Sequence, residues 1–309
     1  MQNTPVSARR LPIARTDLKP ALDQLYASFN IPDSATDPIQ IVRRFTRPDD
    51  REVVAFCAAG LAFGRVSSVL QSIERLLALM GGHPADYVRR FDPQREASSF
   101  EGLGHRWTRG PDLLALVWLL KQMLDRSGSI EGFFLEGFDA AAPDIGPALD
   151  DFSRRARLLD LRRAYGRVPQ RPGVCYFFAR PSSGSACKRL NLFLRWMVRH
   201  DALDLGVWTR VPAAALIVPL DTHVIRLGRC LRLTRYTTPG WKMAQDITAA
   251  LRRFDPADPV KYDFALCHLG MMNACGFNRA QRDSQCPLRG VCRPRESTRR
   301  PSRRSSAPA

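Results

Sequence analysis

The sequence predicts an all-α fold of about ten helices, with two lobes possible, and three observations lead to this prediction. Apolar residues recur at i, i+3 and i+4 spacing through most of the chain. The helical stretches open at Pro-Asp signals and close at glycine. One stretch, GVCYFFA at 173–179, is typical of a β-strand, and it is too short to found a sheet.

The expected helices follow one another along the chain. From about Leu18 the apolar spacing is helical, and Pro48 opens a long apolar stretch that Gly60 and Gly64 divide into two helices. A further helix opens at Pro111-Asp112 and closes at Gly128. The remaining predicted helices cover residues 147–164, 187–199, 221–233, 239–254 and 259–274.

Length and composition indicate an ordinary globular protein. The chain has 309 residues, of which 45% are hydrophobic and 25% charged. We expect a disordered N-terminus over 1–15, a helical domain over 16–292 and a disordered basic tail over 293–309, where Arg, Pro and Ser cannot build a core. No apolar run approaches the roughly 20 residues of a membrane span. We therefore expect a cytoplasmic, nucleoid-associated protein whose eight Cys are reduced.

The charge indicates a polyanionic partner. Lys and Arg number 47 against 30 Asp and Glu, which gives a formal net charge of +17. Nucleic acid is the default partner for such a chain. An acidic membrane surface is the alternative, but the sequence lacks a basic amphipathic helix with a lipidation signal. Heavy Arg usage in a GC-rich genome is another source of the same excess.

Three features in order carry the chemistry. The segment SGSACKRLN (183–191) is a turn that enters an amphipathic helix, with Lys188 in its first turn. In LIVPLDTHVIRLGRCLRL (216–233), Asp221 would cap a helix that begins at Thr222. The third feature is a terminal set of cysteines, which comprises Cys267, Cys275, Cys286 and Cys292.

Over roughly residues 50–292 these features resemble the helix-hairpin-helix DNA glycosylases. Lyase-competent members carry a hairpin G-x-G-x-K-T-A-N, with which Gly184, Lys188 and Asn191 align. Their catalytic loop reads V-D-T-H-V or P-x-D-x-x-V, and Pro219-Leu220-Asp221-Thr222-His223-Val224 matches it here. The chain also resembles a bacterial family of unknown function that is grouped with this superfamily.

The resemblance has departures. Ala186 replaces the second hairpin glycine, and Arg189-Leu190 replaces Thr-Ala. Lys188 and Asp221 lie 33 positions apart (221 − 188), farther than in the common members, and the extra segment is HDALDLGVWTRVPAA. The archaeal 8-oxoguanine glycosylases resemble this layout better.

The resemblance implies a base-excision-repair DNA glycosylase that acts as a monomer on double-stranded DNA with a damaged base. We expect it to be bifunctional, with AP (β-)lyase activity, and to remove an oxidised purine such as 8-oxoguanine. Asp221 would stabilise the oxocarbenium-like transition state and help to deprotonate the attacking group. Lys188 would form a Schiff base at C1′ before β-elimination. A flipped base would stack on an aromatic side chain, for which Trp107, Phe193 and Trp196 are candidates.

The expected DNA contacts lie around the hairpin. Backbone N–H groups of 182–187 would hold a phosphate, with Arg189 nearby. The full set of expected contacts is Gly184, Ser185, Arg189, Asn191 and His223.

The resemblance also implies a 4Fe–4S iron–sulfur cluster, because the iron–sulfur members end in C-x6-C-x2-C-x5-C. Cys286 and Cys292 reproduce the last pair, and Cys275 stands near the first ligand. The second cysteine is missing, so Cys267 would have to supply a ligand, with His268 as its alternative. Zinc and no metal at all remain open.

Simpler interpretations stand beside these. Asp221 can be only a helix cap, Lys188 only a phosphate contact, and His223 a packing residue. On the same fold, a non-catalytic DNA-binding protein, a monofunctional glycosylase that uses water and an RNA-directed enzyme are the alternatives.

Overall fold

The all-α prediction is confirmed by a computed structural model, which describes residues 18–32, 37–272, 286–288 and 291. The described residues form 14 α-helices, short 3₁₀ turns and one two-stranded antiparallel ribbon, β1 (Gly104–His105) with β2 (Thr108–Arg109). The disordered segments expected at 1–15 and 293–309 lie outside the described residues.

The helix bounds are α1 (Leu18–Phe29), α2 (Ile39–Arg43), α3 (Pro48–Leu61), α4 (Val66–Met80), α5 (Pro84–Arg90), α6 (Pro93–Glu96), α7 (Gly110–Ser127), α8 (Ile130–Leu135), α9 (Gly146–Ala156), α10 (Arg162–Tyr165), α11 (Lys188–Val198), α12 (Thr222–Cys230), α13 (Trp241–Arg252) and α14 (Asp263–Met271). The 3₁₀ turns used below are η3 (Gly173–Phe177) and η4 (Pro181–Ser183).

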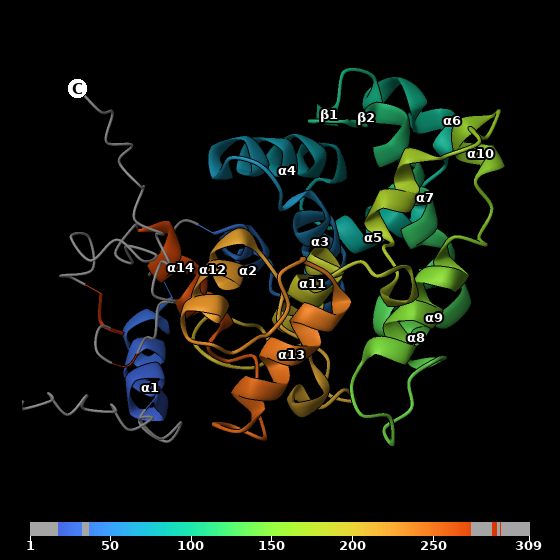
Figure 1. Ribbon diagram of the computed structural model, residues 1–309. Coiled ribbons are helices and arrows are strands. Elements are labelled where there is room, and N and C mark those ends of the chain that lie inside the picture. The colour runs from blue at the N-terminus through green and yellow to red at the C-terminus, as the bar shows by residue number, and fades with distance from the viewer. Residues whose placement is uncertain (1–17, 33–36, 273–285, 289–290, 292–309) are drawn as a thin grey trace, which may run out of the picture.

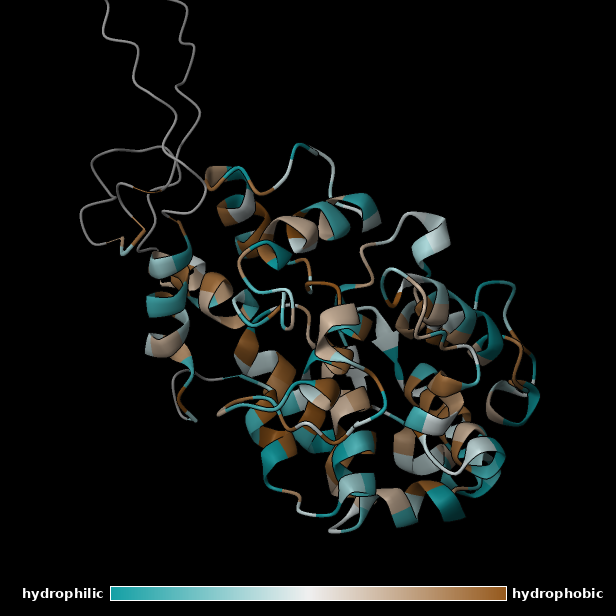
Figure 2. Cartoon of the chain, turned by 90° about the horizontal axis from the view of Figure 1, so that it is seen from below, coloured by the Kyte–Doolittle hydropathy of each residue, from teal (hydrophilic) through white to brown (hydrophobic). Residues whose placement is uncertain are grey.

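Helices α3 and α11 lie in the middle of the molecule and pack against each other (Figure 1). Helices α7 to α10 lie on one side of them, while α1, α12 and α14 lie on the other (Figure 1). Figure 2 shows the apolar residues concentrated in the interior helices and the hydrophilic ones on outer faces. The buried apolar side chains of the described residues form one continuous cluster, so both sides share a core.

Local signals set most helix ends. The long apolar stretch divides into two helices as predicted, and Gly64 adopts φ +103° between them. Gly60, the other predicted breaker, lies inside α3, which ends at Leu61. Gly128, with φ +77°, ends α7 as predicted. No helix among the described residues combines the length and the apolar composition that a membrane crossing requires.

Two predicted elements differ in the structure. The expected helix over 147–164 is two helices, because α9 ends at Ala156 and the Asp160 carboxylate accepts the Arg162 N–H at the start of α10. The strand-like stretch 173–179 forms the 3₁₀ turn η3 instead. Val174, Phe177 and Phe178 of this stretch are buried in the core. The β-type residues here pack against the core and form no sheet.

Candidate functional site

The turn before α11 is built from left-handed residues. Gly184 has φ +80° and ends η4, and Cys187 has φ +48° and precedes Lys188. A non-glycine residue in this region is uncommon and strained, which is a feature found at functional sites. The turn is entered through η3 and η4 rather than through an α-helix. It docks on α13, whose Trp241 N–H donates to the Gly184 carbonyl at 3.1 Å.

Lys188 is half-buried in the first turn of α11 and lines a cavity of about 390 Å³. This volume falls in the range of small-molecule sites. The walls combine the hairpin turn with Phe63, Tyr176 and Phe177 from α3's end and η3. The cavity therefore offers aromatic surface beside an amine.

Asp221 caps α12, as the sequence predicts. Its Oδ1 accepts the Val224 N–H at 2.7 Å, and its Oδ2 accepts the Cys267 thiol at 2.8 Å. Cys267 lies on α14, which packs against α12. Both carboxylate oxygens are thus held, and the carboxyl group has a fixed orientation.

The charges of Lys188 and Asp221 both influence the pKa of the Cys267 thiol. Burial, followed by the negative charges of Asp221 and Asp263, raises the pKa of Cys267 well above its usual range, and the positive charge of Lys188 opposes this rise. Asp221 thus contacts the Cys267 thiol directly, and the charge of Lys188 acts on the same thiol from α11.

The predicted DNA contacts separate into two groups. Gly184 is exposed and Ser185 half-buried on the turn. Asn191 is buried, and its amide donates to the Ala186 carbonyl at 3.1 Å, so it holds the hairpin together instead of facing a ligand.

Arg189 is turned inward. Its guanidinium lies over the Tyr176 ring at 3.4 Å and donates to the carbonyls of Tyr176 and Gly60. Burial lowers the pKa of Arg189 to about 10. The side chain thus shapes the aromatic wall of the cavity, and the structure does not present it as a surface phosphate contact.

His223 packs at the crossing of α12 and α14. A Cβ added at Gly270 would lie 2.6 Å from the His223 Cβ, so the helices approach closely only because residue 270 is glycine. The buried Nδ1 of His223 has no hydrogen-bond partner within the described part of the chain. This arrangement agrees with the packing interpretation.

Several of the turn's N–H groups are already used. Ser182 donates to the Asp150 carboxylate at 2.8 Å, while Ser183 and Gly184 donate to carbonyls within the turn. The N–H groups of Ser185 and Ala186 have no acceptor among the described residues. A phosphate would therefore be held at 185–186 and the first turn of α11, a narrower set than the predicted 182–187.

Of the predicted stacking residues, Trp107 alone is accessible. It is 55% exposed, stacks on Phe63 with ring centroids 4.7 Å apart, and meets Tyr176 edge-on. Phe193 and Trp196 are buried in the core, so they cannot meet a base. The aromatic cluster of Phe63, Trp107 and Tyr176 was not predicted as a unit, because its members come from segments far apart in the sequence.

Sequence reasoning also missed a buried ionic network behind the site. Arg195 on α11 donates to Asp263 on α14 at 2.6 Å and to Asp204 at 3.2 Å. Arg199 pairs with Asp204 and, at 2.9 Å, with Asp258. This network ties α11, which carries Lys188, to α14, which carries Cys267.

The extra segment between Lys188 and Asp221 supplies part of this network. Asp201 and Asp204 lie in it, and so does Trp208, whose indole N–H donates to Glu52 at 2.8 Å. The Glu52 carboxylate also accepts two N–H groups at the start of α8, and burial raises its pKa. The sequence holds one indication of these roles: Asp201 and Asp204 follow closely after Arg195 and Arg199.

Of the four cysteines predicted as metal ligands, Cys267 and Cys286 lie among the described residues. A metal ligand must be a thiolate, whereas Cys267 donates its proton to Asp221 and its pKa is raised, so it does not fit that role in this arrangement. Cys286 is buried, and Cys275 and Cys292 lie outside the described residues. Within the described ranges no three His, Cys, Asp or Glu side chains gather as a metal site. The iron–sulfur cluster stays a prediction.

Other buried thiols are poor nucleophiles. Burial raises the pKa of Cys57 and of Cys187 to about 12, although Cys187 adjoins Lys188. Lys188, rather than Cys187, is therefore the stronger candidate nucleophile at the hairpin.

The comparisons with known proteins give one finding. A family model described as "Protein of unknown function (DUF2400)" matches residues 37–272. No curated protein and no solved structure matches the chain. The matched range spans α2 to α14 and contains both Lys188 and Asp221. The chain therefore belongs to the DUF2400 family.

Proposed function

We propose that the protein is a DNA glycosylase with β-lyase activity that uses Lys188 as nucleophile and Asp221 as charge-stabilising carboxylate. The observation that carries the proposal is that the Asp221 carboxylate, besides capping α12, accepts the Cys267 thiol of α14, on which the charge of Lys188 also acts. A helix cap alone requires no contact with a thiol on another helix.

The proposed reaction has two stages. The Lys188 amine bonds to C1′ of the damaged nucleotide, the glycosidic C1′–N bond breaks, and the base leaves with the bonding electrons. Asp221 stabilises the positive charge that develops on the sugar and takes the amine proton. Opening of the sugar ring at the C1′–O4′ bond turns the adduct into a Schiff base, with the proton going to O4′. Loss of a C2′ proton to a base then drives β-elimination, in which the C3′–O bond breaks, the phosphate leaves and the strand is nicked.

The cavity beside Lys188 supports a planar substrate. Its lining includes Phe63 and Tyr176, which offer aromatic surface to a base flipped out of the duplex, whereas Phe177 is buried. Exposed Trp107, stacked on Phe63, extends this surface outward. An oxidised purine such as 8-oxoguanine remains our preferred base, by resemblance to the archaeal enzymes.

Borohydride trapping tests the nucleophile. The protein is incubated with labelled duplexes that carry 8-oxoguanine, an abasic site or normal guanine, then reduced and run on a denaturing gel. The chain has only five lysines, so the trapped residue can be mapped by peptide analysis; they are Lys19, Lys121, Lys188, Lys242 and Lys261. We expect a covalent band that Lys188→Gln abolishes.

Lys19→Gln is the matched control, because Lys19 is exposed on α1 and bonds Asp23 on its own helix. It should leave the band unchanged. A band that survives Lys188→Gln contradicts the assignment of the nucleophile. No band on any duplex, together with base release, would favour the monofunctional glycosylase instead.

Asp221→Asn separates catalysis from capping. Asparagine caps helices as well as aspartate does, so stability should change by less than about 0.5 kcal/mol. Base release should fall by about a hundredfold or more, because the charge that stabilises the transition state is gone. Unchanged turnover would leave Asp221 as a cap and favour a non-catalytic DNA-binding protein.

A further inference from the structure

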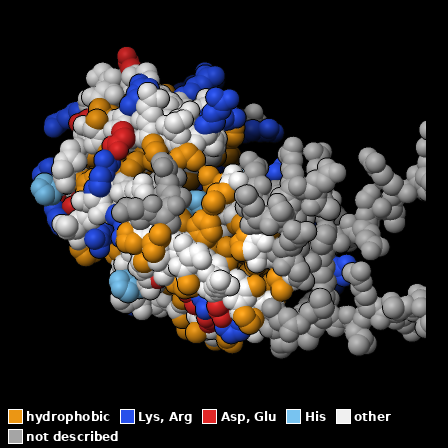
Figure 3. Space-filling view, turned by 90° about the vertical axis from the view of Figure 1, so that its left-hand side faces the viewer, with side chains coloured by type: hydrophobic (Ala, Val, Ile, Leu, Met, Phe, Trp, Pro, Cys, Tyr) orange, Lys and Arg blue, Asp and Glu red, His pale blue; other side chains and the backbone are white. Residues whose placement is uncertain are grey.

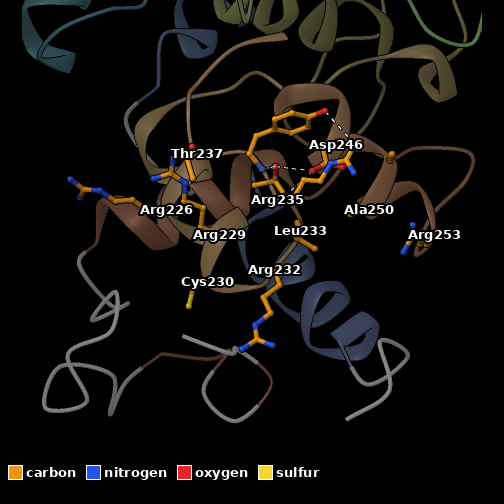
Figure 4. Close-up of a pocket in the computed structure, with 13 residues that line it drawn as sticks. Arg226, Arg229, Cys230, Arg232, Leu233, Arg235, Thr237, Asp246, Ala250 and Arg253 are labelled. Carbon is orange, nitrogen blue, oxygen red and sulfur yellow. Dashed lines mark hydrogen bonds between the residues drawn. The ribbon is translucent and has the colours of Figure 1, made fainter. Parts of the chain in front are cut away.

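A second cavity, of about 710 Å³, lies between α12 and α13 and is lined by arginines (Figure 4). Arg226 and Arg229 come from α12, and Arg232 and Arg235 from the loop that follows. Arg253 comes from the residue after α13. All five side chains are exposed. We call this cavity the arginine groove.

Basic side chains outnumber acidic ones in the arginine groove. Asp246 is the single acidic residue among those that line it, beside the five arginines. That carboxylate already accepts the Thr234 hydroxyl and the Arg235 N–H, both at 2.9 Å. Within the described residues, Arg229, Arg232 and Arg253 have no acidic partner within 4.0 Å. This concentration of positive charge favours an anionic ligand.

The backbone conformation at Arg232 favours glycine, so the fold does not require an arginine side chain at this position. Helix α12 ends in a Schellman motif, in which the Leu233 N–H donates to Gly228 and the Arg232 N–H to Arg229. The position of Arg232 has φ +55°, where glycine is preferred and a side chain is strained. An exposed arginine thus stands at a position where the backbone favours glycine; among the described residues Arg106 and Cys187 also have positive φ.

The arrangement fits an extended polyanion. Arg226, Arg232 and Arg253 point in three different directions in Figure 4, so they do not converge on a single phosphate. The groove shares helix α12 with Asp221, which caps the start of that helix. Arg229 lies eight residues beyond Asp221, about 12 Å along the helix axis at about 1.5 Å per residue. That length equals three to four phosphates of one DNA strand at about 3.4 Å each.

We propose that the arginine groove binds the phosphodiester backbone of the nucleic acid that continues past the Lys188–Asp221 site. This deepens the proposed function, and it rests on that function only for the choice of a nucleic acid as the polyanion. The groove adds affinity and register but contributes no group to the reaction. On the face that Figure 3 shows, basic side chains are more widespread than acidic ones. The test must therefore compare the groove arginines with arginines elsewhere on the surface.

The test compares two triple variants of the full chain. The groove variant carries Arg229→Gln, Arg232→Gln and Arg253→Gln. The matched control carries Arg90→Gln, Arg95→Gln and Arg162→Gln, which remove three exposed arginines from the α5, α6 and α10 region on the opposite side (Figure 1). Binding of an undamaged labelled duplex is measured by fluorescence anisotropy over a range of salt.

We expect the groove variant to bind at least about tenfold more weakly at low salt. Its salt slope, d log K/d log[salt], should fall by about 2 to 3 in magnitude, since each lost phosphate contact removes about 0.9. The control variant should keep both values. Equal losses in the two variants, or none in the groove variant, would overturn the proposal.

Two more probes exclude other anions. Pyrophosphate and phosphatidylserine vesicles are titrated into the wild type and the groove variant. Loss of binding to either probe with unchanged duplex binding would overturn the proposal in favour of a small phosphate ligand or a membrane surface.

The outcome is separable from the proposed chemistry. Binding to undamaged DNA requires no reaction, so a weakened groove variant supports the groove even if no Schiff base is trapped. Conversely, trapping that depends on Lys188 with unaltered duplex binding in the groove variant would uphold the glycosylase and reject the groove. If both hold, the groove variant should raise KM for the lesion duplex and leave kcat unchanged.

Discussion

The arginines of α11 and those around α12 and α13 are the same residue type in opposite situations. Arg195 and Arg199 are buried and paired with carboxylates from three other segments. The arginines that line the groove are exposed, with one acid among them. Arg195 and Arg199 are offset by their acidic partners, so the net charge of +17 arises from other residues. The buried arginines hold helices together, whereas exposed arginines can meet a polyanion.

The largest expected effect comes from removing a buried arginine. Arg195→Met leaves Asp263 buried without its cation, while Asp204 keeps Arg199, and the change should cost about 3 to 5 kcal/mol of unfolding free energy. Arg229→Met on α12 is the matched substitution and should change stability by less than about 0.5 kcal/mol. Urea denaturation measures both. Similar losses at the two positions would break the comparison.

The buried network should also titrate. Burial first, with repulsion from Asp221 and Asp204 also acting, raises the pKa of Asp263 from 3.8 to about 7 against the opposing effect of Arg195. Between these values the folded state binds one proton more than the unfolded state. Stability should therefore fall as pH rises from about 4 to about 7, by up to about 4 kcal/mol, and level off above.

Asp263→Asn should flatten this profile, because asparagine keeps an oxygen for Arg195 but does not titrate. The midpoint of urea unfolding at about pH 5 and about pH 8 gives the comparison. If the variant and the wild type keep the same slope, another group is responsible.

The two faces of α12 provide the third test. One face carries groove arginines, and the other contacts α14 at Gly270. Gly270→Ala would force a Cβ to 2.6 Å from His223, and the helices must separate, at a cost of about 2 kcal/mol. Gly82→Ala is the control, since a Cβ there meets nothing within 4 Å. We expect base release to fall in Gly270→Ala even at temperatures where the variant is folded, because Cys267 and Asp221 move apart.

The smallest effect is expected for an exposed ion pair. Arg44 and Glu74 lie 2.8 Å apart at the surface, and Glu74→Gln should cost less than about 1 kcal/mol. The loss should shrink further in high salt, whereas that of Arg195→Met should not. Thermal unfolding at low and high salt distinguishes exposed from buried pairing.

Much of the fold could be predicted because it depends on neighbours within about four residues. The all-α class, the division of α3 from α4, the end of α7 at Gly128 and the Asp221 cap all follow from apolar spacing, glycine and capping chemistry. The prediction was wrong at 173–179, where β-type residues form a 3₁₀ turn. That turn buries Val174 and Phe177 in the core, a tertiary effect that outweighs local β propensity.

The candidate site was half predictable. Lys188 and Asp221 could be selected by motif, and both lie where the motif places them, at the start of α11 and before α12. The burial and contacts of the neighbouring residues could not be predicted from the sequence. Asn191 and Arg189 turn inward, and Trp107 stays outside while Phe193 and Trp196 are buried, because burial depends on partners from distant segments.

The sequence by itself determined the helices, their caps and the overall positive charge, since each of these is a local or a summed property. Only the tertiary structure decided that Asp221 meets Cys267, which lies 46 positions beyond it. It also decided which arginines are paired, because Arg195 finds Asp263 68 positions away. Electrostatic partners and burial depend on distance in space, which local sequence patterns do not specify.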